Sequence, residues 1–77
     1  MALPYLATVR LVNDNYRAKG AQSGDLGVIL EVWENGEYEV EVSNPATGET
    51  IAWFTASESD LELVDESDAD IARRSAD

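Results

Sequence analysis

The chain contains neither cysteine nor histidine. It therefore has no disulfide framework, no thiol nucleophile, no imidazole base and no set of the usual zinc ligands. Most enzyme classes depend on one of these groups. We accordingly predict a protein that is not an enzyme, with no catalytic residue, no cofactor and no metal site.

Long apolar runs are also missing. No stretch approaches the roughly 20 residues that a membrane-spanning helix needs. The first seven residues, MALPYLA, lack the basic start and the long apolar core of a signal peptide. We predict no membrane association and a cytoplasmic location. At 77 residues the chain is long enough for one small domain.

Positive charge is scarce, with five basic residues against sixteen acidic ones and a net charge of −11. Residues 21–72 hold fourteen carboxylates and no cation; the basic residues are Arg10, Arg17, Lys19, Arg73 and Arg74. A field of one sign repels phosphates, so direct binding of nucleic acid is not expected. A net charge of this size is found in proteins that need it only for solubility, or that belong to an acidic proteome, as often as in proteins that bind a partner.

The most regular stretch is SGDLGVILEVWENGEYEVEV, from Ser23 to Val42. Its apolar residues alternate with others on both sides of Asn35-Gly36, the pattern of a β-hairpin with one buried face. A three-residue loop, Glu34 to Gly36, with Gly36 left-handed in a bulge, gives one face that is wholly apolar. The pairs expected are Val32 with Tyr38, Leu30 with Val40, Val28 with Val42, Glu31 with Glu39, and Ile29 with Glu41.

Three more strands are predicted around this hairpin, at residues 7–12, 50–55 and 61–64. A single helical turn that starts at Ser57 precedes the last strand. Residues 16–22 are expected to form an irregular loop. Trp53 is expected to pack inside together with Ile51. The predicted core contains Val9, Leu11, Leu26, Val28, Leu30, Val32, Tyr38, Val40, Val42, Ile51 and Leu61.

Two segments outside the strands suggest no site. Ser23 to Gly27 is rich in glycine, but no lysine and no helix follows it, so we reject a phosphate loop there. Asp25 is expected to accept hydrogen bonds from nearby turn amides. Residues 65–77 form an acidic tail that is either disordered or a short helix, outside a domain that spans residues 1–64.

The segments VRLV, SGDLGVILEVWENGEYEVEV and SESDLELV are similar in order and spacing to the small bacterial and archaeal domain-of-unknown-function family 4926. The resemblance covers roughly Thr8 to Val64. Val42 stands where that family usually has an aromatic residue. The resemblance implies an all-β fold, a small five-stranded antiparallel SH3-like barrel. It also implies small, stand-alone relatives with an antitoxin-like or immunity-like role, and it supplies no catalytic residue.

The candidate partner-binding residues lie on the outer side of the hairpin: Glu31, Trp33, Glu37, Glu39 and Glu41. A tryptophan ringed by carboxylates suits a basic protein partner, because the aromatic ring supplies contact and the charge supplies rapid association. A solvated strand face is the simpler interpretation of the same residues. A catalytic carboxylate pair or a calcium site is not expected on an open, flat face.

Three function classes follow from these observations. The favoured one is a non-catalytic binding protein that docks a basic protein partner. The second is a nucleic-acid mimic that inhibits a DNA- or RNA-processing enzyme, which requires carboxylates spaced over an extended surface. The third is an accessory subunit of a larger enzyme complex, which requires a large apolar patch on the isolated chain.

Overall fold

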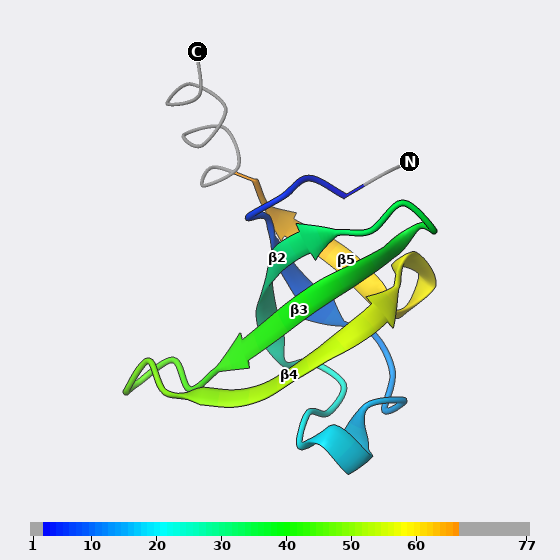
Figure 1. Ribbon diagram of the computed structural model, residues 1–77. Coiled ribbons are helices and arrows are strands. Elements are labelled where there is room, and N and C mark those ends of the chain that lie inside the picture. The colour runs from blue at the N-terminus through cyan, green and yellow to red at the C-terminus, as the bar shows by residue number, and fades with distance from the viewer. Residues whose placement is uncertain (1–2, 67–77) are drawn as a thin grey trace.

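The computed structural model describes residues 3–66, which form one five-stranded antiparallel sheet (Figure 1). The strands are β1 (Thr8–Leu11), β2 (Leu26–Val32), β3 (Glu37–Ser43), β4 (Thr50–Ser57) and β5 (Leu61–Asp65). They are ordered β4-β3-β2-β1-β5. Two 3-10 helices, η1 (Arg17–Lys19) and η2 (Glu58–Asp60), follow β1 and β4. The predicted all-β class, with five antiparallel strands and one helical turn before the last, is confirmed.

The predicted acidic tail falls mostly outside the described residues, which end at Glu66. Its first residue, Asp65, ends β5 and pairs with Thr8. Within residues 3–66 there is no helix long and apolar enough to cross a membrane.

The core lies on the concave side of the sheet, where every second strand residue points inward. Six of the predicted core residues are buried there: Val9, Leu11, Tyr38, Val40, Val42 and Leu61. The remaining buried apolar residues were not predicted: Leu3, Ala7, Ala21, Ile29, Ala52, Phe54 and Ala56. Burial of a medium-sized apolar side chain contributes roughly 1.5–3 kcal/mol, so these residues dominate the stability of the sheet.

The hairpin turn between β2 and β3 has the predicted geometry. Trp33 and Glu37 close it through a Trp33 N–H to Glu37 carbonyl hydrogen bond of 2.8 Å. Gly36 has a φ of +87°, in the left-handed region that favours glycine. Val32 pairs with Tyr38 and Glu31 with Glu39, as expected. The three-residue loop is therefore confirmed.

Further along β2 the predicted register is wrong. The register shifts between Ile29 and Glu31, so Leu30 is an extra residue in the ladder. Because of this β-bulge, the residues of β2 that lie before Leu30, away from the hairpin turn, point to the opposite face from the one predicted. The observed pairs are Ile29 with Val40, Val28 with Glu41, and Gly27 with Val42.

The bulge explains why part of the predicted core is exposed. Ile29 is buried in place of its neighbours Val28 and Leu30, which are only partly buried. Leu26, at the start of β2, is exposed, whereas Val32 keeps its predicted pair with Tyr38 and is exposed at the hairpin end of the strand. Ile51, at the start of β4, is exposed as well.

Gly27 occupies a place in β2 where no larger residue fits. A Cβ atom there would lie 2.8 Å from Val40 Cγ1 and 2.9 Å from the Glu41 carbonyl oxygen. Strand β3 therefore approaches β2 more closely than any side chain at this position would allow.

Candidate partner-binding face

The glutamates of β3 all point to the convex side of the sheet, because Tyr38, Val40 and Val42 between them point into the core. Glu37 and Glu41 are about 13 Å apart along the strand. We call this convex surface of β2, β3 and β4 the outer face; it carries Val28, Glu31, Trp33, Glu37, Glu39, Glu41, Trp53, Thr55 and Ser57.

Strand pairing arranges the outer face in three rows. Glu41 lies between Val28 of β2 and Trp53 of β4. Glu39 lies between Glu31 and Thr55 in the next row. In the last row Glu37 lies between Trp33, to which the hairpin hydrogen bond joins it, and Ser57. The structure therefore brings all five predicted partner-binding residues onto one surface.

Neutral side chains orient the three β3 carboxylates. The Thr50 hydroxyl donates to Glu41 Oε2 over 2.6 Å, and the Thr55 hydroxyl donates to Glu39 Oε1 over 2.8 Å. At the hairpin end, the Asn35 side-chain amide donates to Glu37 Oε1 over 2.6 Å. Each of the three carboxylates is thus held in place by a hydrogen bond from an uncharged donor.

No cation of residues 3–66 forms an ion pair with the outer-face glutamates. Arg10 pairs with Glu62 at 2.6 Å on the β1–β5 side of the sheet, and Arg17 lies 3.8 Å from Asp14. Like charges such as Glu31 and Glu39, which are directly opposed, destabilise a sheet by up to roughly 1 kcal/mol. This face therefore has a net attraction for positive charge that the described residues do not satisfy.

Two tryptophans lie at opposite ends of the outer face. Trp33 is 47% exposed at the hairpin, in agreement with its predicted place. Trp53 was predicted to pack inside with Ile51, and this is wrong, because Trp53 is 61% exposed. Phe54 is buried instead and stacks on Tyr16, with ring centroids 4.3 Å apart. The outer face thus has a second aromatic residue that the sequence pattern did not reveal.

A second cluster surrounds Asp60, which is 8% exposed and the one buried charged residue among residues 3–66. Its carboxylate accepts hydrogen bonds from the side-chain amides of Asn13 (2.8 Å) and Asn15 (3.0 Å). The Tyr16 hydroxyl donates a third, of 2.5 Å. The loop after β1 is thereby fastened to the junction of β4 and β5.

The pKa values of this cluster shift in the directions that its contacts require. The hydrogen bond from Tyr16 is the main cause that lowers the pKa of Asp60, against the opposing effect of burial. Burial, followed by the hydrogen bond to Asp60, raises the pKa of Tyr16 to about 12. A tyrosine with this pKa stays protonated at neutral pH and keeps donating its hydrogen bond to Asp60.

Sequence reasoning missed this cluster. The sequence predicts a helical turn that starts at Ser57, but no contact between Asp60 and the loop after β1. The turn is present as η2, but the Ser57 side chain makes no capping hydrogen bond. The sequence does contain a signal for the cluster: Asp60 directly precedes an apolar strand, and Asn13, Asn15 and Tyr16, which can donate hydrogen bonds to a carboxylate, lie together in one loop.

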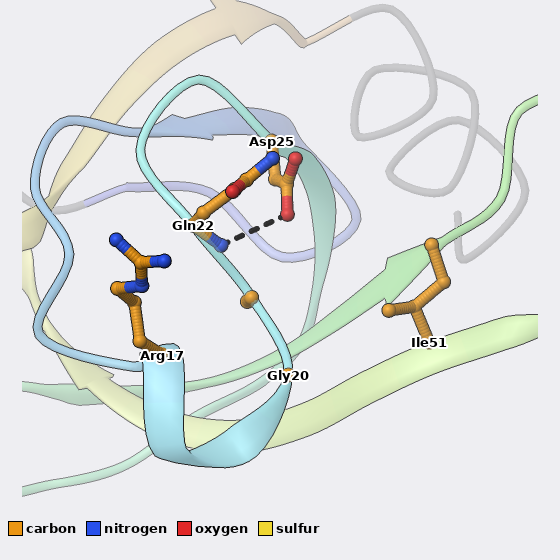
Figure 2. Close-up of a pocket in the computed structure, with 6 residues that line it drawn as sticks. Arg17, Gly20, Gln22, Asp25 and Ile51 are labelled. Carbon is orange, nitrogen blue, oxygen red and sulfur yellow. Dashed lines mark hydrogen bonds between the residues drawn. The ribbon is translucent and has the colours of Figure 1, made fainter.

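The glycine-rich turn from Gly20 to Asp25 lies beside a shallow hollow of about 410 Å³ (Figure 2). Arg17 of η1 and Ile51 of β4 lie on opposite sides of this turn. Its six main-chain amides all donate to protein acceptors; the acceptors are the carbonyls of Arg17, Tyr16, Leu11 and Gln22 and the carboxylates of Asp25 and Asp14. No main-chain donor of this turn is left for an anion, and the expected hydrogen bond to Asp25, from the Gln22 amide, is present at 3.0 Å.

Residues 3–66 contain no group of three or more histidine, cysteine, aspartate or glutamate side chains placed to hold a metal ion.

The family model called Domain of unknown function (DUF4926) matches residues 5–63. The chain belongs to this family. The DUF4926 match runs from the turn before β1 into β5 and so includes the whole outer face. No curated protein and no solved structure matches the chain.

Proposed function

We propose that the protein is a non-catalytic binding protein that docks a basic protein partner on its outer face, as an antitoxin or immunity protein does. The observation that carries this proposal is the pairing of Trp53, 61% exposed, with the unneutralised carboxylate of Glu41 on the neighbouring strand. Exposed tryptophan is unfavourable on a surface that serves only solubility. Tryptophan is common where a partner buries it.

The charge distribution supports the same proposal. Residues 21–66 contain twelve carboxylates and no cation. A surface of one sign attracts an opposite partner over several ångströms and raises its association rate, while aromatic contacts prolong the complex. The four outer-face glutamates supply the first effect, and Trp33 and Trp53 supply the second. We place this activity in the cytoplasm, as expected from the lack of a signal-peptide pattern in the first seven residues.

Two other functions have weaker support. Glu37, Glu39 and Glu41 are evenly spaced, as a nucleic-acid mimic requires, but they extend over only about 13 Å. Exposed apolar residues such as Leu26 and Ile51 favour an accessory subunit of a larger complex. Neither alternative explains why the tryptophans flank the glutamate row.

The proposal is tested by titrating ¹⁵N-labelled protein with a lysine-rich peptide, Lys-Thr-Lys-Val-Lys-Thr-Lys. We expect the amide and indole shifts to change on the outer face, at Glu39, Glu41 and Trp53 above all. Exposed carboxylates elsewhere, at Glu49 and Glu66, serve as internal controls. Shift changes spread equally over the outer face and these controls would show that the protein has only a diffuse acidic surface, and would overturn the proposal.

A further inference from the structure

Strand β4 is at one end of the sheet order, so one of its sides has no neighbouring strand among residues 3–66. Which main-chain groups face that side follows from the ladder. Trp33 N–H donates to the Glu37 carbonyl, so the main-chain groups of Glu37 and every second residue after it face β2. On β2, the Ile29 N–H donates to the Ala7 carbonyl, away from β3. Val40, which pairs with Ile29, therefore cannot exchange main-chain hydrogen bonds with it and faces β4, in agreement with the assignment from Glu37.

The residues of β3 between these glutamates therefore bond to β4. Their partners on β4 are Ala56, Phe54 and Ala52. It follows that the N–H and C=O groups of Trp53 and Thr55 point away from the sheet. Antiparallel pairing thus leaves two donors and two acceptors at the open edge.

The same edge is covered at both ends. Ser57 N–H donates to the Tyr16 hydroxyl over 3.3 Å. At the other end, the Ile51 carbonyl lies against the loop after η1, where a Cβ on Gly20 would be 3.5 Å from it. The open section is therefore Trp53 to Thr55.

Edge strands usually carry a charged residue, a proline or a bulge that prevents pairing with another chain. From Trp53 to Ser57 the sequence is WFTAS, with no charge and no proline. The register with β3 is continuous over these residues. The edge keeps the geometry needed to accept another strand.

Resting on the function proposed above, we propose that the basic partner supplies an extended segment that adds to β4 as a sixth strand, with lysine or arginine at every second position. The segment pairs its main chain with Trp53 and Thr55. Its basic side chains lie on the outer face beside Trp53. Glu39 and Glu41 are one strand farther away, about 10 Å from the added strand, within reach of long basic side chains.

Charge complementarity identifies the occupant. A second copy of this chain would bring another net charge of −11 to the same edge. A basic helix would satisfy the glutamates but would leave the main-chain groups of Trp53 and Thr55 without partners. A basic extended segment satisfies both sets of groups.

Peptides methylated on the main chain test the proposal. The peptide Lys-Thr-Lys-Val-Lys-Thr-Lys is compared with two forms of equal charge, N-methylated at its odd or at its even positions. An added strand donates from one alternate set only, so we expect one methylated form to bind at least tenfold more weakly and the other to bind like the parent. The parent peptide is expected to slow hydrogen exchange at the Trp53 and Thr55 amides.

The outcomes separate the two proposals. If both methylated forms bind as tightly as the parent and still shift the outer-face signals, strand addition is overturned while the basic-partner function stands. If no peptide shifts those signals, the basic-partner function itself is overturned. Exchange at Trp53 and Thr55 that slows with protein concentration alone would identify a second copy as the occupant and overturn strand addition by a basic partner.

A protein variant gives an independent check. Thr55→Pro removes the outward N–H but no main-chain hydrogen bond of the sheet. Thr55→Val keeps that N–H. Both variants lose the hydroxyl that donates to Glu39, so they differ in the N–H. With both variants folded by circular dichroism, Thr55→Pro is expected to weaken binding of the parent peptide at least tenfold relative to Thr55→Val. Equal affinity of the two variants contradicts strand addition.

Discussion

The Tyr16 hydroxyl lies 2.5 Å from the Asp60 carboxylate, across 44 positions of sequence. Tyr16 also stacks on Phe54, so one side chain joins the loop after β1 to both β4 and the η2 turn. This contact places Phe54 in the core and consequently its neighbour Trp53 on the outer face. The orientation of the proposed binding face therefore depends on a partly buried polar contact of Tyr16 and on the stacking of its ring on Phe54.

Replacing Tyr16 with phenylalanine keeps the stacked ring and removes the hydroxyl. We expect the free energy of unfolding to fall by about 1–3 kcal/mol at pH 7, as for a lost hydrogen bond to a charged group. The pKa of Tyr16 is raised from 10.0 to about 12, so its contribution is complete below pH 10 and is lost as the pH rises toward 12. Urea midpoints from pH 8 to 12 should show this alkaline loss in the wild type and not in Tyr16→Phe. The exposed Tyr5→Phe serves as the control and should keep it.

At acid pH the partner group, Asp60, gives the opposite dependence. Its pKa lies below the ordinary 3.8, so it stabilises the fold above that pH and ceases to do so as the pH falls through the lowered value. Asp60→Asn should be less stable at pH 7 and should lose less stability than the wild type when the pH is lowered from 5 to 2. Glu49→Gln, on the exposed β3–β4 loop, is the control and should follow the wild type. An acid transition of equal size in Asp60→Asn and wild type would contradict the role assigned to Asp60.

Neighbouring residues of β4 test the orientation of that strand. Phe54→Ala is expected to reduce the free energy of unfolding by roughly 3–5 kcal/mol, because Phe54 is 4% exposed and stacks on Tyr16. Trp53→Ala is expected to change it by about 0.5 kcal/mol or less. Chemical denaturation of the two variants decides the point. A larger loss for Trp53→Ala would show that the strand faces the other way.

Two glycines of the hairpin should respond to substitution for different reasons. Gly27→Ala is expected to cost roughly 1–3 kcal/mol, since the added Cβ would overlap Val40 and Glu41. At Gly36 there is open space but φ is +87°, so Gly36→Val is expected to cost about 1–3 kcal/mol and Gly36→Asn much less. Denaturant midpoints measure all three. Equal midpoints for Gly36→Val and Gly36→Asn would contradict the left-handed turn.

Strand β3 could be predicted from sequence because its alternation is strict and each glutamate alternates with one apolar residue. Strand β2 could not, because Val28, Ile29 and Leu30 are consecutive and apolar. Either Ile29 or its two neighbours can face inward, and the bulge at Leu30 decides between them. Periodicity carries no information about the position of a bulge.

The same limit applies to β4, where Ile51 to Phe54 are all apolar. Trp53 was expected in the core together with Ile51, but Phe54 is the residue that points inward, where its ring stacks on Tyr16. Tyr16 belongs to a segment that had been predicted as an irregular loop. The outer face was therefore predicted in its acidic part and missed in its second tryptophan.

The central claim is that the outer-face charges attract a basic partner specifically. Stopped-flow association of the peptide Lys-Thr-Lys-Val-Lys-Thr-Lys, followed by tryptophan fluorescence, tests it most directly. The triple variant Glu37→Gln, Glu39→Gln and Glu41→Gln is compared with a control of equal charge, Glu49→Gln, Glu62→Gln and Glu66→Gln. The account predicts that at low salt the first variant associates about tenfold more slowly than wild type, with a flatter salt dependence, while the control stays within about twofold. Equal rates for the two variants would contradict the account, because the outer face would then be only one part of a uniformly acidic surface.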